Sequence, residues 1–254
     1  MTRIVPHGPR LTFAAGFCLL AVTISGTLEA QTPAPPPRQI KFTANAGFVD
    51  AAGNSEITTL SGDERIEYRP AGTGWTLSQF IGAVYGRTDG VTSANRIKGG
   101  VRAQHVVGDK LSAFVSGEYE RNRFAGIRRR FEEVVSLSFA LLNGGRTELA
   151  LEIGAAFNQQ RDLEGVDNSF VAARTAGEFK QLLTESAYVQ QKVELLPNLE
   201  HAEDLRVNSE TAVVAPLSKR FAVKLSYAIR FDNLPEPGFQ TTDRVFTSGL
   251  QVTL

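Results

Sequence analysis

Charged side chains recur at every second position along much of this sequence, between large apolar residues. In the segment from Phe221 to Phe231, Lys224 and Arg230 alternate with valine, leucine and isoleucine. A period of two places the charges on one face of an extended strand and the apolar residues on the other. If such strands enclose an interior, their charges can line a narrow aqueous path and bias its ion selectivity. We expect this interior set to comprise Arg96, Lys98, Arg102, Glu118, Glu120, Glu148, Glu152, Arg174, Glu178, Lys180, Lys192, Glu194, Arg206, Glu210, Lys224 and Arg230.

The same charges can also pair across strands, fill the interior and hold it rigid. The signs within the set are nearly balanced, which favours pairing over an open path. The whole chain has 27 basic and 27 acidic side chains. Nucleic-acid binding usually requires a clustered basic excess, so we expect no nucleic-acid partner.

Enzymatic chemistry has little support among the remaining residues. A serine hydrolase needs a base beside its nucleophile, and the candidates are His105 and His201. His105 lies near a predicted tight turn and His201 in a predicted longer loop, so we expect them at opposite rims. No nucleophile-elbow motif accompanies either histidine. We therefore predict that the protein is not an enzyme, and keep a lipid hydrolase or acyltransferase as an alternative.

Two acidic groups deserve a test as metal sites, because hard cations prefer several oxygen ligands. Neither group has the spacing of a defined cation-binding loop, so we predict no metal and no cofactor. Acidic outer loops could also engage divalent-bridged lipopolysaccharide. The groups are Glu200, Glu203 and Asp204, and Asp162, Glu164 and Asp167.

The elements that must position these residues are strands. The last stretch is a hairpin whose connection, Asn233 to Thr242, contains Pro235, Pro237 and Gly238. These residues set turns and cannot continue a ladder. An open hairpin with so much apolar surface needs a cover, and if lipid covers it the strands must close into a barrel. From Ile40 onward the sequence divides into about twelve segments of period two.

The predicted connections tend to alternate between tight and long, as in outer-membrane barrels, whose periplasmic turns are short and whose outer loops are longer. A soluble β-sandwich would not sort its loops in this way. The tight connections are expected near Pro70 to Gly74, Gly108 to Lys110, Asn143 to Arg146, Leu183 to Glu185 and Pro216 to Lys219. The longer ones are expected near Arg87 to Ser93, Asn122 to Ile127, Arg161 to Asn168, Leu196 to Asp204 and Asn233 to Thr242.

The N-terminus is typical of an exported protein. Arg3, His7 and Arg10 precede an apolar run from Leu11 to Ile24, which predicts a signal peptide over residues 1–30. Residues 31–39 are rich in proline and are expected to form a periplasmic tether. Cys18 is the only cysteine, so the exported chain is expected to form no disulfide.

Several segments together resemble a bacterial family of salt-induced outer-membrane proteins, classed as a domain of unknown function. They are Gly47-Phe48-Val49, Gly53-Asn54-Ser55, Thr58-Thr59-Leu60, Tyr119 to Ile127, Leu205 to Thr211, Arg230-Phe231-Asp232, Pro235, Gly238, Thr242 and Asp243. The resemblance implies an outer-membrane barrel. It assigns no chemistry and no functional residues.

We therefore predict an all-β fold, a closed antiparallel transmembrane barrel of about twelve strands over residues 40–254. The expected function is a non-enzymatic outer-membrane protein, structural or weakly channel-forming, linked to salt stress only through the family resemblance. A narrow porin for ions or small solutes is the alternative. The expected partners are outer-membrane lipid, lipopolysaccharide and, through the C-terminal strand, the assembly machinery. We expect a monomer.

Overall fold

The computed structural model describes residues 40–51 and 57–254. The predicted signal peptide and the proline-rich tether lie outside this range. In the described part of the chain, no helix is long and apolar enough to cross a bilayer. The one helical element there is a short 3₁₀ turn, η1, at Arg123–Ala125.

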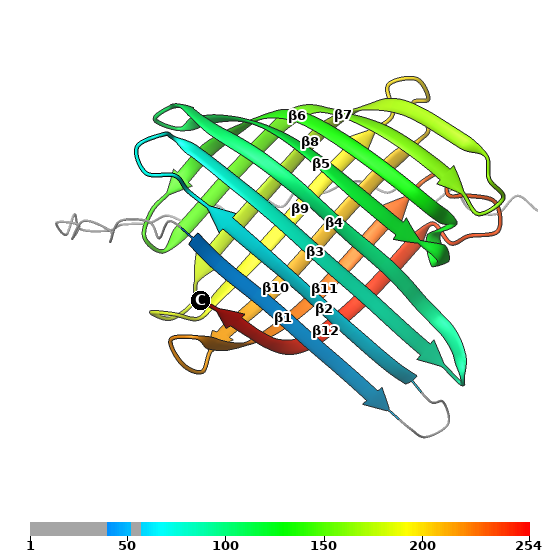
Figure 1. Cartoon of the computed structure of the whole chain (residues 1–254), viewed down its shortest axis with the longest axis horizontal. Helices are drawn as coiled ribbons and strands as arrows, with labels where there is room; N and C mark the ends of the chain where they lie inside the picture. The colour runs from blue at the N-terminus through cyan, green and yellow to red at the C-terminus, as the bar shows by residue number, and fades with distance from the viewer. Residues whose placement is uncertain (1–39, 52–56) are drawn as a thin grey trace, which may run out of the picture. The chain divides into compact units, whose positions relative to one another are not determined.

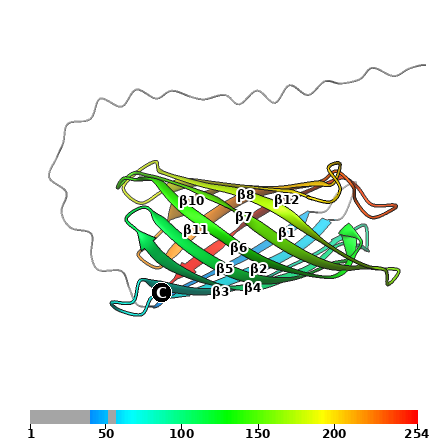
Figure 2. The same cartoon turned by 90° about the horizontal axis from the view of Figure 1, so that it is seen from above.

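Twelve antiparallel strands form a closed barrel in which each strand pairs with its neighbours in sequence and β1 pairs with β12. Their alternating residue pattern is the reason they are strands. Figures 1 and 2 show the strands running obliquely around the barrel. The strands are β1 Ile40–Ala51, β2 Ile57–Tyr68, β3 Trp75–Thr88, β4 Val91–Gly108, β5 Leu111–Asn122, β6 Ile127–Asn143, β7 Thr147–Asp162, β8 Asp167–Leu182, β9 Tyr188–Pro197, β10 Leu205–Pro216, β11 Phe221–Asp232 and β12 Thr242–Thr253. The predicted closed barrel of about twelve strands is confirmed.

The predicted alternation of tight and long connections is only partly present. The connection expected to be tight near Pro70 to Gly74 spans residues 69–74, whereas two that were expected to be longer span only residues 123–126 and 163–166. The sequence led us to expect a longer loop near Arg87 to Ser93, whereas β3 and β4 are joined by Asp89 and Gly90 alone. Both residues have positive φ, 50° and 77°. An Asp-Gly pair in this conformation suits a two-residue hairpin turn, and the ladder therefore continues to Thr88 and Val91.

Alternate residues of each strand face outward and inward. Large apolar side chains are exposed on the outward face, including Ile81, Val101, Val135 and Ile153. On the inward face lies a buried cluster, formed by β5 to β9 and comprising Phe114, Val134, Ala156, Phe170, Ala172 and Leu196. The barrel is thus apolar outside and partly filled inside.

Candidate functional site: the interior of the barrel

The strand register fixes where the predicted interior set lies. Arg102, for example, is opposite Ser78 and Ser116, on the same face as the buried Phe114. The same reading of the ladders places every residue of the set on the inward face. These charges therefore share one enclosed space.

An ion-pair network bridges the interior at its middle. Arg174 on β8 lies 2.9 Å from Glu152 and 2.7 Å from Glu194. Glu152 on β7 also receives a hydrogen bond of 2.8 Å from Arg102 on β4. On the other side, Asn208 on β10 donates to Glu194 at 2.9 Å. The network therefore links β4 to β10, and charge-assisted bonds of this kind hold their partners firmly.

The network covers the buried apolar cluster. β5 and β6 separate β4 from β7 in the sheet order, so the Arg102 side chain must cross over them to reach Glu152. On its way the guanidinium lies 3.4 Å from the centroid of the Phe114 ring, a close cation–π contact. The ion pairs and the apolar cluster together fill this part of the interior.

Other members of the set pair in the same way. Arg96 lies 2.6 Å from Glu120, Lys180 lies 3.1 Å from Glu148, Lys192 lies 3.5 Å from Glu178, and Lys224 lies 3.4 Å from Glu210. Lys98 pairs with Glu118, and Arg206 lies 3.3 Å from Asp232.

The charged and polar filling is concentrated on the inward face of β5 to β10, which we call the packed side. Here Asn158 is 1% exposed, and Glu120 and Arg206 are each 9% exposed. Polar groups buried to this extent normally need partners. Yet both amide atoms of Asn158 lack one, which makes this a place where an internal water can bind.

The inward face of β12, β1, β2 and β3 is different, and we call it the open side. It carries small polar residues such as Thr43, Ser61, Ser78 and Thr247, the ring of Phe80 and, on β2, the charged Asp63 and Arg65, whose guanidinium lies 5.3 Å from the centroid of that ring. Asp63 and Arg65 point into the barrel and are nevertheless exposed to solvent. Water therefore reaches the interior on this side.

The connection between β11 and β12, residues 233–241, crosses one mouth of the barrel, and we call it the crossing loop. Glu236 in this loop accepts a hydrogen bond of 2.5 Å from Gln160 on β7. β7 lies five places from β12 in the ring of strands, so this bond spans the mouth. The loop also packs against the turn after β5, where a Cβ added to Gly126 would lie 2.7 Å from the Cβ of Glu236.

The base of the crossing loop is tied to the neighbouring connection. The backbone N–H of Asn233 donates to the carbonyl of Leu205 at 3.0 Å, and its side-chain amide donates to the carbonyl of Glu203 at 2.8 Å. The loop is thus tied to its neighbours at Asn233 and to β7 at Glu236.

Sequence reasoning missed several interior residues. Arg130 donates to Gln160 at 2.8 Å, and Gln160 in turn reaches the crossing loop. Asp204 lies 3.8 Å from Arg206. The alternation of Arg130 and Glu132 around Phe131 could have revealed the inward pair. It was hidden by the run Arg128, Arg129 and Arg130, which reads as a solvated cluster.

The residues considered for enzymatic and metal chemistry do not form a site in the described structure. The ring of His105 packs against Trp75, with centroids 4.7 Å apart. His201 lies in the connection before β10, at the other end of the barrel. Among residues 40–51 and 57–254, no group of three or more His, Cys, Asp or Glu could hold a metal ion.

Comparison with known proteins identifies the family but no activity. The chain is 23% identical over 219 residues to the uncharacterized protein YdiY of Escherichia coli (strain K12), covering 86% of this chain and 84% of that protein. Two solved structures are similar at low identity. The KdgM porin in complex with disordered oligogalacturonate has a TM-score of 0.49 at 10% identity, covering 84% of this chain and 98% of the porin. The translocator domain of the autotransporter NalP from Neisseria meningitidis has a TM-score of 0.46 at 11% identity, covering 84% and 86%.

A family model described as "Protein of unknown function, DUF481" matches residues 44–254, from the first strand to the last residue. The chain belongs to this family.

Proposed function

We propose that this protein spans the bacterial outer membrane as a single-chain barrel with a narrow, weakly conducting aqueous path along the open side of its interior. The observation that carries the proposal is the solvent exposure of Asp63 and Arg65, which point inward from the middle of β2, whereas the central ion pairs of the packed side are largely buried. Charges in a confined aqueous path set which ions pass.

The outward face supports a membrane environment. Exposed apolar side chains continue around the barrel, among them Phe48, Ile81, Val135, Leu225 and Leu250. A surface of this extent is unfavourable in water, and a closed barrel is one of two structures that can span lipid. Trp75 and Tyr85 lie near the two ends of β3 on this face, as aromatic side chains do at membrane–water boundaries.

The network on the packed side explains why the path should be narrow. A barrel of this strand number lies between small filled barrels and wide porins. Ion pairs and the apolar cluster occupy the β5 to β10 side, and the crossing loop spans one mouth. A barrel that only supports the envelope, without conduction, is the second candidate, and these same features favour it.

Two measurements separate these possibilities. First, the refolded barrel should migrate differently in detergent gels before and after boiling, which a soluble sandwich would not do. Second, a planar bilayer should show small single-channel steps in potassium chloride. A heat-modifiable barrel without steps would favour the purely structural role. A protein without heat-modifiable migration would contradict the membrane assignment.

A further inference from the structure

The outward face at the end of β5 and the start of β6 carries a group of arginines that the interior network does not use. A hollow of about 680 Å³ is lined there by Tyr119, Arg121, Arg123, Arg128, Arg129 and Leu163, with no carboxylate in its lining. We call it the arginine hollow. A concave surface of one sign attracts a ligand of the other.

Two irregularities in the ladders bring these side chains together. The register with β5 shifts between Glu120 and Asn122, and the register with β7 shifts between Ile127 and Arg129. In both ladders the extra residue lies on β6. Arg121 is therefore opposite both Arg128 and Arg129. Bulges often re-aim side chains in this way and are frequent near functional sites.

The arginines of the hollow are poorly neutralised within the described chain. Arg121, Arg123 and Arg128 form no ion pair there, and Arg129 reaches Asp167 only at 3.9 Å. Arg128 is held in place by a 2.6 Å bond to the carbonyl of Leu163. The Nε atom of Arg121 is buried without a hydrogen-bond partner. Guanidinium groups with free donors suit phosphate oxygens, which they can bind in a bidentate manner.

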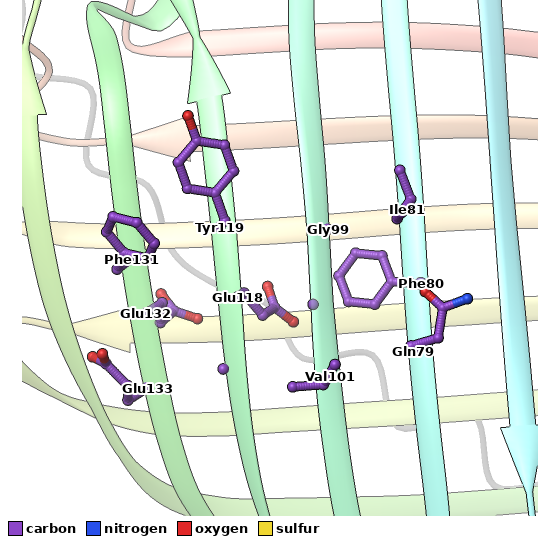
Figure 3. A pocket seen from close by; sticks show the side chains of 12 residues that line it. Gln79, Phe80, Ile81, Gly99, Val101, Glu118, Tyr119, Phe131, Glu132 and Glu133 are labelled. Atoms are coloured by element: carbon purple, nitrogen blue, oxygen red, sulfur yellow. The ribbon is translucent and has the colours of Figure 1, made fainter.

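An apolar hollow continues directly below the arginines. Its volume is about 510 Å³, and Tyr119 lines both hollows. The ring of Tyr119 lies 5.2 Å from that of Phe131. Figure 3 shows Tyr119 between Phe131 and Gly99, with Ile81 on the strand beyond Gly99 and Val101 on the same strand as Gly99. Gly99 and Gly117, on neighbouring strands, leave this part of the wall without side chains.

The two hollows match the polarity of a lipid. Along the outer wall, charged side chains are followed by aromatic rings and then by an apolar surface. In the apolar hollow the only outward carboxylate is Glu133, which accepts from Gln159 at 3.4 Å. Glu118 and Glu132 line the same wall from its inward face. The arginine hollow lies at the barrel end opposite the start of β1 and the end of β12. With the termini on the periplasmic side, that end meets the outer leaflet.

We propose that the arginine hollow binds the phosphate of a phosphorylated, acylated lipid of the outer leaflet, lipopolysaccharide, whose acyl chain lies along Tyr119 in the apolar hollow. This inference depends on the proposed membrane location. A bound lipid would supply the negative charge that the chain itself does not place beside these arginines.

The test uses the full barrel refolded in detergent micelles and titrated with purified lipid A, with retained lipid counted by native mass spectrometry. The unaltered protein should retain lipid A, and a dephosphorylated lipid A should bind at least about tenfold more weakly, because its charge-assisted bonds are lost. The triple variant R121Q/R128Q/R129Q should show a similar loss. Arg244→Gln, on the outward face of β12 at the same end but outside the hollow, should bind normally.

Three outcomes would overturn the proposal: equal binding of the dephosphorylated lipid, equal binding by the triple variant, or displacement of lipid A by millimolar inorganic phosphate alone. If the triple variant does not fold, Arg121→Gln alone and the charge-conserving R121K/R129K take its place, and both should bind more weakly than the unaltered protein. Heat-modifiable migration is recorded for every sample. A barrel that folds but ignores lipid phosphate contradicts this inference alone, whereas a protein that forms no barrel contradicts the proposed function.

Discussion

The packed side and the open side of the barrel are built from the same alternating strands, but they are held together differently. On the packed side, side chains meet one another: Arg174 is wedged between two carboxylates above an apolar cluster. On the open side the backbones themselves come close, and Gly47 faces Gly249 where β1 and β12 join. Paired charges therefore fill the middle of the packed side, whereas small residues leave room for water on the open side.

Removal of Arg174 should produce the largest effect on stability. In Arg174→Ala, Glu152 and Glu194 lose the cation between them, and the side chain is only 11% exposed. Loss of one partner from a buried ion-pair network should destabilise the barrel by about 3 kcal/mol. Urea unfolding in lipid vesicles, followed by the fluorescence of the single tryptophan, Trp75, measures it. An unchanged midpoint would mean that the packed side does not depend on charge pairing.

A methyl group at Gly249 tests the close backbone approach on the open side. Its Cβ would lie 2.2 Å from the carbonyl oxygen of Ala46, so the seam between β1 and β12 must shift. We expect Gly249→Ala to cost about 2 kcal/mol in the same unfolding assay. Gly177→Ala is the matched control, since its nearest neighbour would be Ala150 at 3.9 Å. Equal effects of both changes would show that the seam tolerates side chains.

A bulky residue on the open side should reduce conduction without a large loss of stability. Ser61 points inward from β2 beside Gly47. In Ser61→Trp, the indole should lower single-channel conductance by roughly half or more, because it narrows the proposed path. Ser248→Trp, which faces outward from β12, should leave conductance unchanged. Equal currents in both variants would place the path elsewhere.

The crossing loop should limit entry rather than stability. Glu236→Ala removes the acceptor for Gln160 and so frees the loop from the packed side. We expect conductance to rise by up to about twofold, with more frequent current fluctuations, since mouth loops set access to a lumen. Glu200→Ala, in the exposed neighbouring connection, is the control. A conductance unaffected by Glu236→Ala would show that the loop does not obstruct the mouth.

The smallest effect is expected at the rim of the packed side. Lys180 and Glu148 are 3.1 Å apart, but their side chains are 31% and 54% exposed. Lys180→Ala should therefore change the free energy of unfolding by less than about 0.5 kcal/mol. This variant also serves as the control for Arg174→Ala, on the same face of the same strand. A loss as large as that at Arg174 would remove the distinction between buried and exposed pairs.

Much of this fold could be predicted because strand alternation is a local property. Phe221 to Phe231 and Leu149 to Phe157 already separate an outward from an inward face. The turn at Asp89 and Gly90 was missed because the polar residues around it mimic a longer loop. Turn-forming residues show where a chain reverses its direction, but they say less about how many residues remain unpaired there.

The interior contacts were less accessible to sequence reasoning. Alternation predicts that Arg102 points inward, but not that it reaches Glu152 on the far side of two strands. That contact depends on barrel closure and curvature. Likewise, nothing in the spacing of Glu236 connects it to Gln160, 76 residues earlier. The arginine hollow depends on an extra residue in β6 that shifts its register with both neighbouring strands, which no periodicity reveals.

The pairing of β1 with β12 constrains how the barrel assembles. Phe42 and Leu254 exchange both backbone hydrogen bonds, at 3.0 and 2.9 Å. The ring of strands therefore cannot close before the last strand is present. Without β12 the sheet has two open edges, and the backbone groups at these edges cannot form hydrogen bonds in lipid. In the proposed outer-membrane location, the pairing of β1 with β12 must therefore be one of the last steps of assembly.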